Sequence, residues 1–305
     1  MRATSSNLQV ICAPCRSCLV TPTSPPRRSI HTSTSSISPR STTALIHARK
    51  LHPKAAPNPV RDFHGKKSEL NRRLLTFDLD NTLWDVNAVI IAAEKAMRGW
   101  LEVHVPEVVA FYQTQGVADI RSRVIAEHPE FRHNLSRLRT LVVQRSIEAC
   151  GYGPAQASTL AQAAFTVFME CRHRVQYFEG ALETLDQLAG NYTLAALSNG
   201  NADIARLGLD RYFSFSCSAA DVGASKPAPD MFLAALNRAG VKARDAAHVG
   251  DHLHDDIAGA IGVGMHAVWC NFVGQERPAD SVAPSATVTS LAALLAVIED
   301  LFSAR

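Results

Sequence analysis

The feature that most constrains this fold is an alternation of short apolar runs and helical patterns from residue 178 to the end of the chain. The expected strands are the apolar runs at 192–197, 213–218, 247–249 and 266–269. The expected helices carry apolar residues at helical spacing and occupy 181–188, 202–207, 230–239, 256–263 and 290–302. Strands that alternate with helices form parallel sheets, because each helix carries the chain back to the end at which the previous strand began. The pattern therefore predicts an α/β fold with a doubly wound parallel sheet.

A further apolar run, at about 72–78, lies far upstream of this alternation and has the composition of a buried strand. Between it and the later strands the sequence is mostly helical, with apolar residues at helical spacing and few strand signals. We therefore expect a core made of residues 69–87 and 178–305. A helical cap over 88–177 would leave the sheet and return to it.

The beginning of the chain has a different composition. The first 61 residues contain seven Arg, two Lys and no acidic residue, about +9 in charge, whereas the whole chain carries +3. Because the segment is rich in Ser, Thr, Pro and Arg, we expect residues 1–68 to be a disordered leader. Two interpretations stay open: an organellar transit peptide, or an upstream extension from a misplaced start of a cytoplasmic protein. The basic charge is confined to this leader, so a nucleic-acid partner is not expected for the remainder.

Two other properties limit the function. The chain has seven cysteines, an odd number at scattered positions, which argues against a disulfide framework and favours a reducing compartment. No run of about 18 apolar residues is present, so a transmembrane helix is not expected. The sequence therefore predicts a protein that works without a membrane, and it leaves the oligomeric state open.

Two acidic residues, Asp78 and Asp80, end and follow the apolar run at 72–78, and Asn81-Thr82 supplies turn residues directly afterwards. The carboxyl end of such a strand is where open α/β sheets bind their ligands. Residues i and i+2 of a strand share a face, so the two carboxylates should lie together and repel each other unless a cation or a proton separates them. The pair points to Mg²⁺, to phosphate chemistry, or to both.

Three further polar loops follow expected strands or begin expected helices. They are 197–200 (Leu-Ser-Asn-Gly), 225–227 (Ser-Lys-Pro) and 250–256 (Gly-Asp-His-Leu-His-Asp-Asp). Each loop alone is ordinary turn or surface chemistry. Together with the aspartate pair, and in this order on a strand–helix framework, they form a much more specific constellation.

These four loops resemble the motifs of the haloacid dehalogenase (HAD) superfamily over about residues 72–290. The gap of about 120 residues between the first two resembles the subclass with a helical cap inserted after the first motif. The residues at 77–84, 198–202, 225–231, 248–251 and 256–260 are similar to those of the YigB group of bacterial flavin mononucleotide (FMN) phosphatases. The resemblance implies a Rossmann-like core and Mg²⁺-dependent hydrolysis of FMN or of 5-amino-6-(5-phospho-D-ribitylamino)uracil, a riboflavin precursor. The alternatives are another capped phosphatase, such as one for phosphoglycolate, and a non-enzymatic HAD-like binding protein.

The resemblance also implies unequal roles for the two aspartates. Asp78 would attack phosphorus and form an aspartyl-phosphate. Asp80 would protonate the leaving alkoxide and then deprotonate the attacking water, so surroundings that favour its neutral form are expected. Dehalogenases of the superfamily lack an acid at this position, so Asp80 favours phosphoester hydrolysis. Mg²⁺ would bind the Asp78 carboxylate, the Asp80 carbonyl and Asp251.

The remaining loops would supply the phosphate contacts. Ser198 and the Asn199 amide would donate hydrogen bonds to phosphoryl oxygens, and Lys226 would neutralise charge in the transition state. The adjacent acids Asp255 and Asp256 could each hold a metal-bound water or orient the lysine. The resemblance aligns Asp256 with the family position, and we favour that residue.

The cap should select the substrate, but the sequence does not single out its contact residues. The basic candidates are Arg121, Arg123, Arg132, His133, Arg137, Arg139 and Arg172. Most residues of this kind on helices are simply solvated. Trp84 lies six residues after Asp78 and could either stack on a flat ring or pack between the core and the cap.

Overall fold

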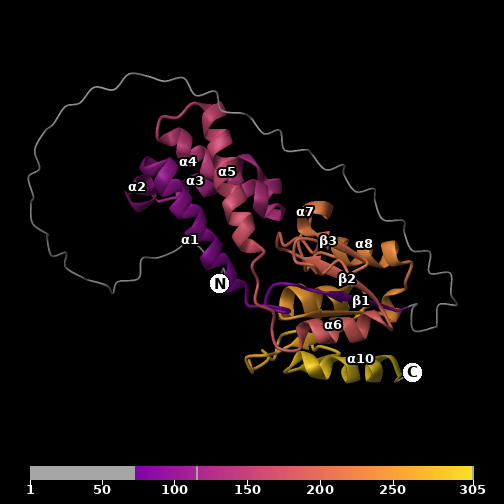
Figure 1. Ribbon diagram of the computed structural model, residues 1–305. Coiled ribbons are helices and arrows are strands. Elements are labelled where there is room, and N and C mark those ends of the chain that lie inside the picture. Colours follow the sequence, from indigo (N-terminus) through magenta and orange to yellow (C-terminus); the bar gives the residue numbers. More distant parts are fainter. Residues whose placement is uncertain (1–72, 115, 304–305) are drawn as a thin grey trace, which may run out of the picture. The chain divides into compact units, whose positions relative to one another are not determined.

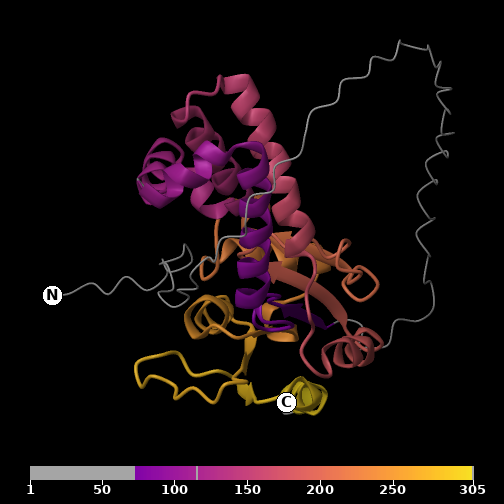
Figure 2. The ribbon, with the colours of Figure 1, turned by 60° about the vertical axis from the view of Figure 1, so that its left-hand side comes forward.

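The computed structural model describes residues 73–114 and 116–303. All of them belong to one unit of the chain, Asp62–Arg305. The leader predicted for residues 1–68 lies outside the described residues. Figures 1 and 2 show the described elements from two sides.

Six parallel strands of the described chain form one sheet in the order β3-β2-β1-β4-β5-β6. The strands are β1 Leu74–Phe77, β2 Thr193–Ser198, β3 Phe215–Ser218, β4 Ala246–Gly250, β5 His266–Cys270 and β6 Ala286–Val288. β1 lies between β2 and β4, although more than a hundred residues separate it from β2 along the chain. The predicted parallel sheet is confirmed. β6 was not predicted, because its three residues are too few to form a recognisable apolar run.

Side chains of successive strand residues alternate between two apolar clusters, one on each face of the sheet. The first cluster is covered by α6 (Ala181–Ala189) and α10 (Leu294–Ser303). The second is covered by α8 (Asp230–Ala239) and α9 (Gly259–Gly262). Because both faces are buried, the central strands β1, β2 and β4 are mostly apolar, as is typical of parallel sheets.

The connections contain several short elements. They are α7 (Ala219–Val222), the 3₁₀ turns η3 (Ala243–Asp245) and η5 (Leu291–Ala293), and the π-helical turn η4 (Leu253–Ala258). The helix expected at 202–207 is wrong, because this segment forms turns. Asp203 Oδ1 accepts a hydrogen bond from the Ala205 N–H at 2.9 Å, and local bonds of this kind compete with helix formation. A helix in so short a segment would also form too few hydrogen bonds to offset the free-energy cost of helix nucleation.

The chain between β1 and α6 contributes helices and, within its described residues, no strand. These helices are called the helical insert below, and they are α1 Val86–His104, α2 Pro106–Thr114, α3 Ala118–Glu127, η2 Pro129–His133, α4 Leu135–Ala149 and α5 Pro154–Arg172. The Asp85 carboxylate caps α1 by accepting a hydrogen bond from the Asn87 N–H at 2.9 Å. α1 and α5 run alongside each other in both views (Figures 1 and 2) and share apolar clusters of their own. The helical pattern predicted for 88–177 is therefore present, and the exact domain boundary stays a prediction.

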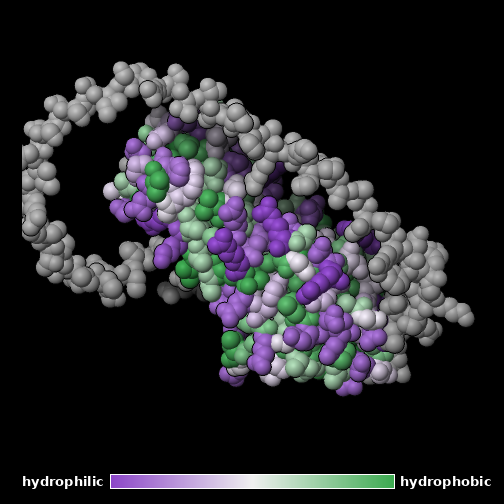
Figure 3. Space-filling model, in the orientation of Figure 1, coloured by the Kyte–Doolittle hydropathy of each residue, from purple (hydrophilic) through white to green (hydrophobic). Residues whose placement is uncertain are grey.

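The surface helices are mixed in character. None in the described part of the chain is long and apolar enough to cross a membrane. On the face seen in Figure 3, hydrophilic residues lie among hydrophobic ones over most of the coloured surface. The buried apolar side chains pack mainly on the two faces of the sheet and within the helical insert.

Candidate active site

The carboxyl ends of β1, β2 and β4 lie next to each other because these strands are parallel neighbours. β1 is fully buried and ends at Phe77, and the next residue, Asp78, donates its N–H to the Val249 carbonyl at 2.9 Å. Asn81 then adopts a left-handed φ of 61°, which asparagine tolerates better than most residues. Its side chain accepts a hydrogen bond from the Val86 N–H at 3.1 Å and so fixes the turn into α1.

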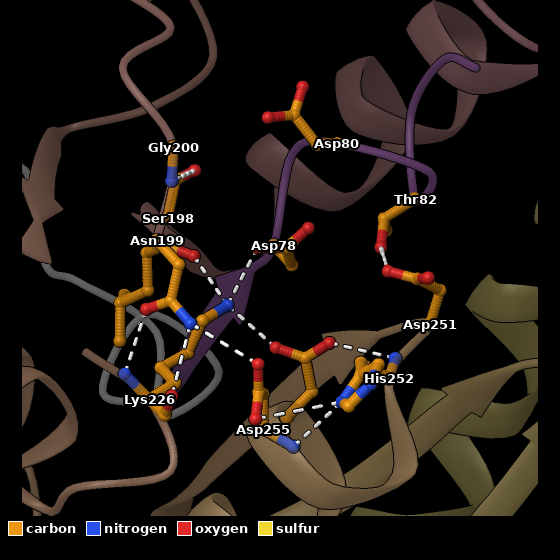
Figure 4. Close-up of polar contacts among 12 residues, drawn as sticks. Asp78, Asp80, Thr82, Ser198, Asn199, Gly200, Lys226, Asp251, His252 and Asp255 are labelled. Atoms are coloured by element: carbon orange, nitrogen blue, oxygen red, sulfur yellow. Dashed lines mark hydrogen bonds and ion pairs between the residues drawn. The ribbon is translucent and has the colours of Figure 1, made fainter. Parts of the chain in front are cut away.

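Lys226 lies at the centre of a buried group of acids. Its ammonium donates to Asp78 Oδ1 at 2.7 Å, to Asp256 Oδ1 at 2.6 Å and to the Leu197 carbonyl at 2.9 Å. Only 3% of the residue is exposed. An ammonium has three hydrogens to donate, and all three have acceptors here. Figure 4 shows Asp78, on the loop after β1, joined to the Lys226 ammonium, and Asp256 reaches the same ammonium from the turn after β4.

The structure distinguishes the two adjacent acids that the sequence left open. Asp256 contacts Lys226, and its second oxygen accepts a hydrogen bond from the His252 N–H at 2.9 Å. Asp255 instead accepts a hydrogen bond from the Asn199 side chain at 3.4 Å. The geometry therefore agrees with the choice of Asp256 as the acid beside the lysine.

His248 is a site residue that sequence reasoning missed. It is fully buried on β4, with Nε2 at 3.1 Å from Asp256 Oδ1 and Nδ1 at 2.8 Å from Thr76 Oγ1. Burial lowers the pKa of His248, so the ring is neutral. Because a carboxylate only accepts hydrogen bonds, Nε2 carries the hydrogen and Nδ1 accepts from the threonine hydroxyl. The signal in the sequence was a histidine inside an otherwise apolar strand.

The loop after β2 holds the lysine loop in place. Asn199 accepts a hydrogen bond from the Lys226 N–H at 2.8 Å and donates one to the Lys226 carbonyl at 3.0 Å. These bonds occupy the side-chain amide, so the phosphate contact predicted for the Asn199 amide falls to its main-chain N–H. Ser198 Oγ accepts from the Gly200 N–H at 2.9 Å, and its own hydroxyl hydrogen can still be donated to a ligand.

Negative charge exceeds positive charge in this group. Asp78, Asp251 and Asp256 offer carboxylate oxygens that all lie within 4.8 Å of one another, beside the single ammonium of Lys226. Burial, reinforced by Asp256, raises the pKa of Asp251 to about 6. Burial also raises the pKa of Asp78 well above its ordinary value, although Lys226 opposes the shift. On Asp256 the effect of burial is outweighed by Lys226 and His248, and its pKa is lowered. Three carboxylates against one ammonium leave two negative charges uncompensated, and a divalent cation would balance them.

The donor set fits Mg²⁺, which prefers hard oxygen ligands. Asp78 and Asp251 are the carboxylates with raised pKa values, and they are the ones that a cation would stabilise in the ionised form. Thr82 Oγ1 lies 3.5 Å from Asp251 Oδ1 and helps to orient it. Asp256 already accepts three hydrogen bonds, which suits it better to a metal-bound water than to direct ligation.

Asp80 does not contact Lys226, although its charge adds to the raised pKa of Asp78, as the expected repulsion between the two acids implies. β1 ends at Phe77, so the strand periodicity does not extend through both acids, and Figure 4 shows the Asp80 carboxylate directed away from Lys226. Instead, Arg172 Nη2 lies 2.7 Å from both Asp80 oxygens. Surroundings that favour a neutral carboxyl were expected, and the structure provides a cationic partner.

Trp84 completes the surroundings of Asp80. Its indole N–H donates to Asp80 Oδ1 at 2.9 Å, and the side chain is 0% exposed. It packs edge-on against Tyr177, with ring centroids 5.8 Å apart. Stacking of Trp84 on a ligand ring is therefore wrong, and the packing interpretation is correct.

Two of the seven basic candidates form contacts with residues outside the helical insert. Arg172 does so through Asp80, and His133 Nδ1 lies 2.9 Å from Ser225 Oγ, next to the lysine loop. Arg139 is instead paired with Glu94 inside the helical insert, at 3.0 Å. The solvated interpretation is thus wrong for Arg172, which is 1% exposed.

Comparison with known proteins supports this picture. The sequence matches the haloacid dehalogenase-like hydrolases over residues 73–264, more than half of the chain. The chain belongs to this family. The match of this HAD-like hydrolase includes all four loops described above and the strands β1 to β4.

Two relatives of this HAD-like hydrolase are phosphatases by name. The 5-amino-6-(5-phospho-D-ribitylamino)uracil phosphatase YigB of Escherichia coli (strain K12) is 35% identical over 195 residues, which are 64% of this chain and 82% of that protein. The phosphoserine phosphatase of Thermus thermophilus is 35% identical over 136 residues, 43% of this chain and about half (53%) of that protein. With phosphatases among its relatives, the HAD-like hydrolase is an enzyme of the phosphatase class.

A solved structure of a 2-haloacid dehalogenase from Pseudomonas syringae pv. tomato DC3000 has the same fold. It is 44% identical, superposes with a TM-score of 0.72, and covers 75% of this chain and 98% of that chain. The shared fold includes the parallel sheet that positions the Lys226 group.

Proposed function

We propose that this HAD-like hydrolase is a Mg²⁺-dependent phosphomonoesterase that works through an aspartyl-phosphate on Asp78. The observation that supports it best is the buried contact of 2.7 Å between Asp78 and Lys226. A carboxylate is ionised at neutral pH and attacks without a base, and the ammonium beside it compensates charge on the phosphoryl group. Asp256 and the Leu197 carbonyl hold the ammonium in place.

In the first half-reaction, an Asp78 oxygen bonds to phosphorus while the bond to the leaving oxygen breaks. Ser198 donates its hydroxyl hydrogen to a phosphoryl oxygen, and Asp80 gives a proton to the leaving alkoxide. Mg²⁺, held by the Asp78 and Asp251 carboxylates and the Asp80 carbonyl, would screen the repulsion between the nucleophile and the phosphate dianion.

In the second half-reaction, water replaces Asp78 on phosphorus. Asp80 takes a proton from this water as the new oxygen–phosphorus bond forms, and the Asp78 carboxylate is released together with inorganic phosphate. Lys226 again compensates charge as the phosphoryl group moves between the two oxygens. The carboxyl of Asp80 is thereby reprotonated, and the enzyme is ready for another ester.

The proposed substrate is a small metabolite with a phosphorylated alkyl chain on a flat heterocycle, either FMN or 5-amino-6-(5-phospho-D-ribitylamino)uracil. Its support is the identity of 35% to the Escherichia coli phosphatase named for the second compound. In this proposal the helical insert is the cap that covers the heterocycle. Phosphoglycolate is the smaller alternative and carries no ring.

The test is a substrate panel with the full chain and Mg²⁺. Phosphate release is measured for FMN, the uracil precursor, phosphoglycolate and phosphoserine, and kcat/KM is compared. We expect one of the two ribityl phosphates to exceed the others by about tenfold or more. A higher kcat/KM for phosphoglycolate would overturn the substrate class, and no release from any ester would overturn the proposed reaction.

A 2-haloacid is the competing substrate, because one similar solved structure is titled a dehalogenase. The retained acid Asp80 favours ester hydrolysis instead. Chloride release from L-2-chloropropionate, measured under the same conditions, should therefore be absent. Rapid chloride release together with no phosphate release would reverse the assignment.

A further inference from the structure

Arg172 is the last residue of α5, where the helical insert returns toward the sheet. Its side chain is 1% exposed, and it joins Asp80 through Nη2 and the Asn201 side chain through Nε, the latter at 3.3 Å. The outgoing and returning connections of the insert are also hydrogen-bonded to each other, from the Phe178 N–H to the Leu83 carbonyl at 2.8 Å. Arg172 therefore ties the end of the insert to an acid on the connection that leads into it.

The two oxygens of Asp80 have different surroundings. Oδ1 accepts hydrogen bonds from the Trp84 indole at 2.9 Å and from Arg172 at 2.7 Å, whereas Oδ2 has Arg172 alone. Oδ2 therefore keeps an acceptor position for a further hydrogen-bond partner. A Cβ added to Gly200 would lie 2.6 Å from this Oδ2 and 3.1 Å from Ser198 Oγ, so the two oxygens border the same space. Oδ2 thus lies on the side of the proposed phosphate donor Ser198.

We propose that Arg172 is a positioning residue for proton transfer by Asp80, supplied by the helical insert. It would hold the carboxyl so that Oδ2 gives its proton to the leaving oxygen as the phosphorus–oxygen bond breaks, and takes one from water in the second half-reaction. The inference rests on the proposed roles of Asp78 and Asp80.

The unused donor of Arg172 supports a role at the site. Its Nη1 is the buried side-chain nitrogen that lacks a hydrogen-bond partner within residues 73–303 as described. Groups that serve only to stabilise a fold have their buried donors satisfied in the great majority of cases. A buried guanidinium with a spare donor is more typical of a residue next to a ligand.

The inference predicts an effect that depends on the leaving group. The p-nitrophenolate ion leaves p-nitrophenyl phosphate without needing a proton. The phenolate of phenyl phosphate is as basic as the tyrosine side chain, whose pKa is about 10, and it benefits from an acid. A general acid contributes about 10²–10⁴-fold, so a misplaced Asp80 should slow the second ester far more than the first.

The experiment measures kcat/KM for both esters with the full chain and Mg²⁺. We expect Arg172→Met to lower the value for phenyl phosphate by about 100-fold and that for p-nitrophenyl phosphate by about threefold or less. Arg172→Lys, which keeps the charge but not the planar fork, should recover about tenfold of the loss. Asp80→Asn should show the same selectivity, and the double variant should be within about twofold of Asp80→Asn alone.

Arg139→Met is the matched control, since Arg139 is also an ion-paired arginine of the insert, with its guanidinium 4.0 Å from the Phe168 ring centroid. Arg139→Met should change kcat/KM by the same factor for both esters. An equal loss on both esters for Arg172→Met, or an unchanged or faster phenyl phosphate reaction, would overturn the inference. If Arg172→Met does not fold, the ratio of the two esters for Arg172→Lys decides.

The controls also separate this inference from the proposed function. If Asp80→Asn is itself not selective between the esters, the acid role of Asp80 fails and the inference fails with it. If Asp80→Asn is selective and the Arg172 variants are not, only the role of Arg172 is wrong.

Discussion

Two buried cations hold the two acids of the loop after β1, and they come from different parts of the molecule. Lys226 contacts Asp78 from the strand-bearing part, and Asp256 contacts the same ammonium. Arg172 contacts Asp80 from the end of the helical insert. The first contact is fixed by neighbouring loops of one sheet, whereas the second depends on where the insert lies.

The difference suits the two tasks proposed above for these acids. The attacking carboxylate must stay in one place relative to phosphorus, and the ammonium of Lys226 has an acceptor for each of its hydrogens. The proton carrier must gain and lose a proton between half-reactions, and Arg172 still has a donor without a partner. In the proposed reaction, the sheet edge would hold the nucleophile Asp78, and the insert would hold the proton carrier Asp80.

The largest expected effect tests the sheet side of this comparison. Asp78→Asn should lower the rate of phosphate release by about 10³-fold or more, because an amide does not form the acyl phosphate. The protein should remain folded, since the amide oxygen can still accept a hydrogen bond from Lys226. Phosphate release and thermal unfolding measure the two effects.

Trapping gives the control for this substitution. Labelled phosphate should become attached to the unaltered chain during turnover and not to the Asp78→Asn chain. Retention of more than about a tenth of the activity by the variant would show that Asp78 is not the nucleophile.

The next effect concerns the second acid on Lys226. Asp256→Asn should reduce the free energy of unfolding by about 3–5 kcal/mol, because it removes one carboxylate from a buried ion pair and places an amide beside two donors. Urea denaturation measures the change. The adjacent Asp255→Asn is the matched control and should cost less than about 0.5 kcal/mol, because Asp255 does not contact the lysine. Similar costs for both variants would contradict the assignment of Asp256.

The surplus of acids on the sheet side predicts a dependence on pH and metal. The pKa of Asp251 is about 6 in the folded protein and about 4 in an unfolded chain, so the folded state holds a proton that the unfolded state releases. In metal-free protein this stabilisation is complete below about pH 4 and is lost as pH rises through about 6. The loss is at most about 3 kcal/mol.

Unfolding in EDTA at about pH 5 and about pH 8 measures this loss. Mg²⁺ should raise the melting temperature more at the higher pH, because it competes with the proton for the carboxylates. Asp251→Asn should remove the part of the difference that this carboxyl supplies, whereas the part from Asp78, whose pKa is also raised, should remain. An equal response to Mg²⁺ at both would argue against a metal site made by these acids.

The smallest effect lies on the insert side. Trp84→Phe removes the indole donor to Asp80 Oδ1 and should cost about 1 kcal/mol of stability, with a smaller loss of phenyl phosphate hydrolysis than Arg172→Met. Trp100→Phe, within the insert, is the control and should leave the ratio of the two aryl phosphates unchanged. A larger effect of Trp84→Phe than of Arg172→Met would shift the positioning role to the tryptophan.

Much of the sheet could be predicted from the sequence because its signals are local. Apolar runs and turn residues predicted five of the six strands in the described chain, and the order of the loops pointed to the sheet edge where Asp78, Lys226 and Asp256 meet. The helix expected at 202–207 failed because an aspartate side chain offered the backbone a competing local bond.

The surroundings of Asp80 could not be predicted in the same way. Arg172 lies 92 residues from it along the chain, and its pattern on a helix does not differ from that of a solvated arginine. His248 was also missed, because its contact with Asp256 depends on how the loop after β4 folds back over the strand. No local pattern in the sequence indicates that these segments contact each other in the fold.

The sequence by itself determined the α/β class and the set of chemical groups, since hydrophobic period and turn chemistry act over a few neighbouring residues. Only the tertiary structure decided which cation each of the two aspartates contacts. Because β1 ends one residue before Asp78 and the chain turns at Asn81, Asp78 meets Lys226 while Asp80 meets Arg172. The end of β1 at Phe77 and the turn at Asn81 thus give different cationic partners to two carboxylates that lie two residues apart in the sequence.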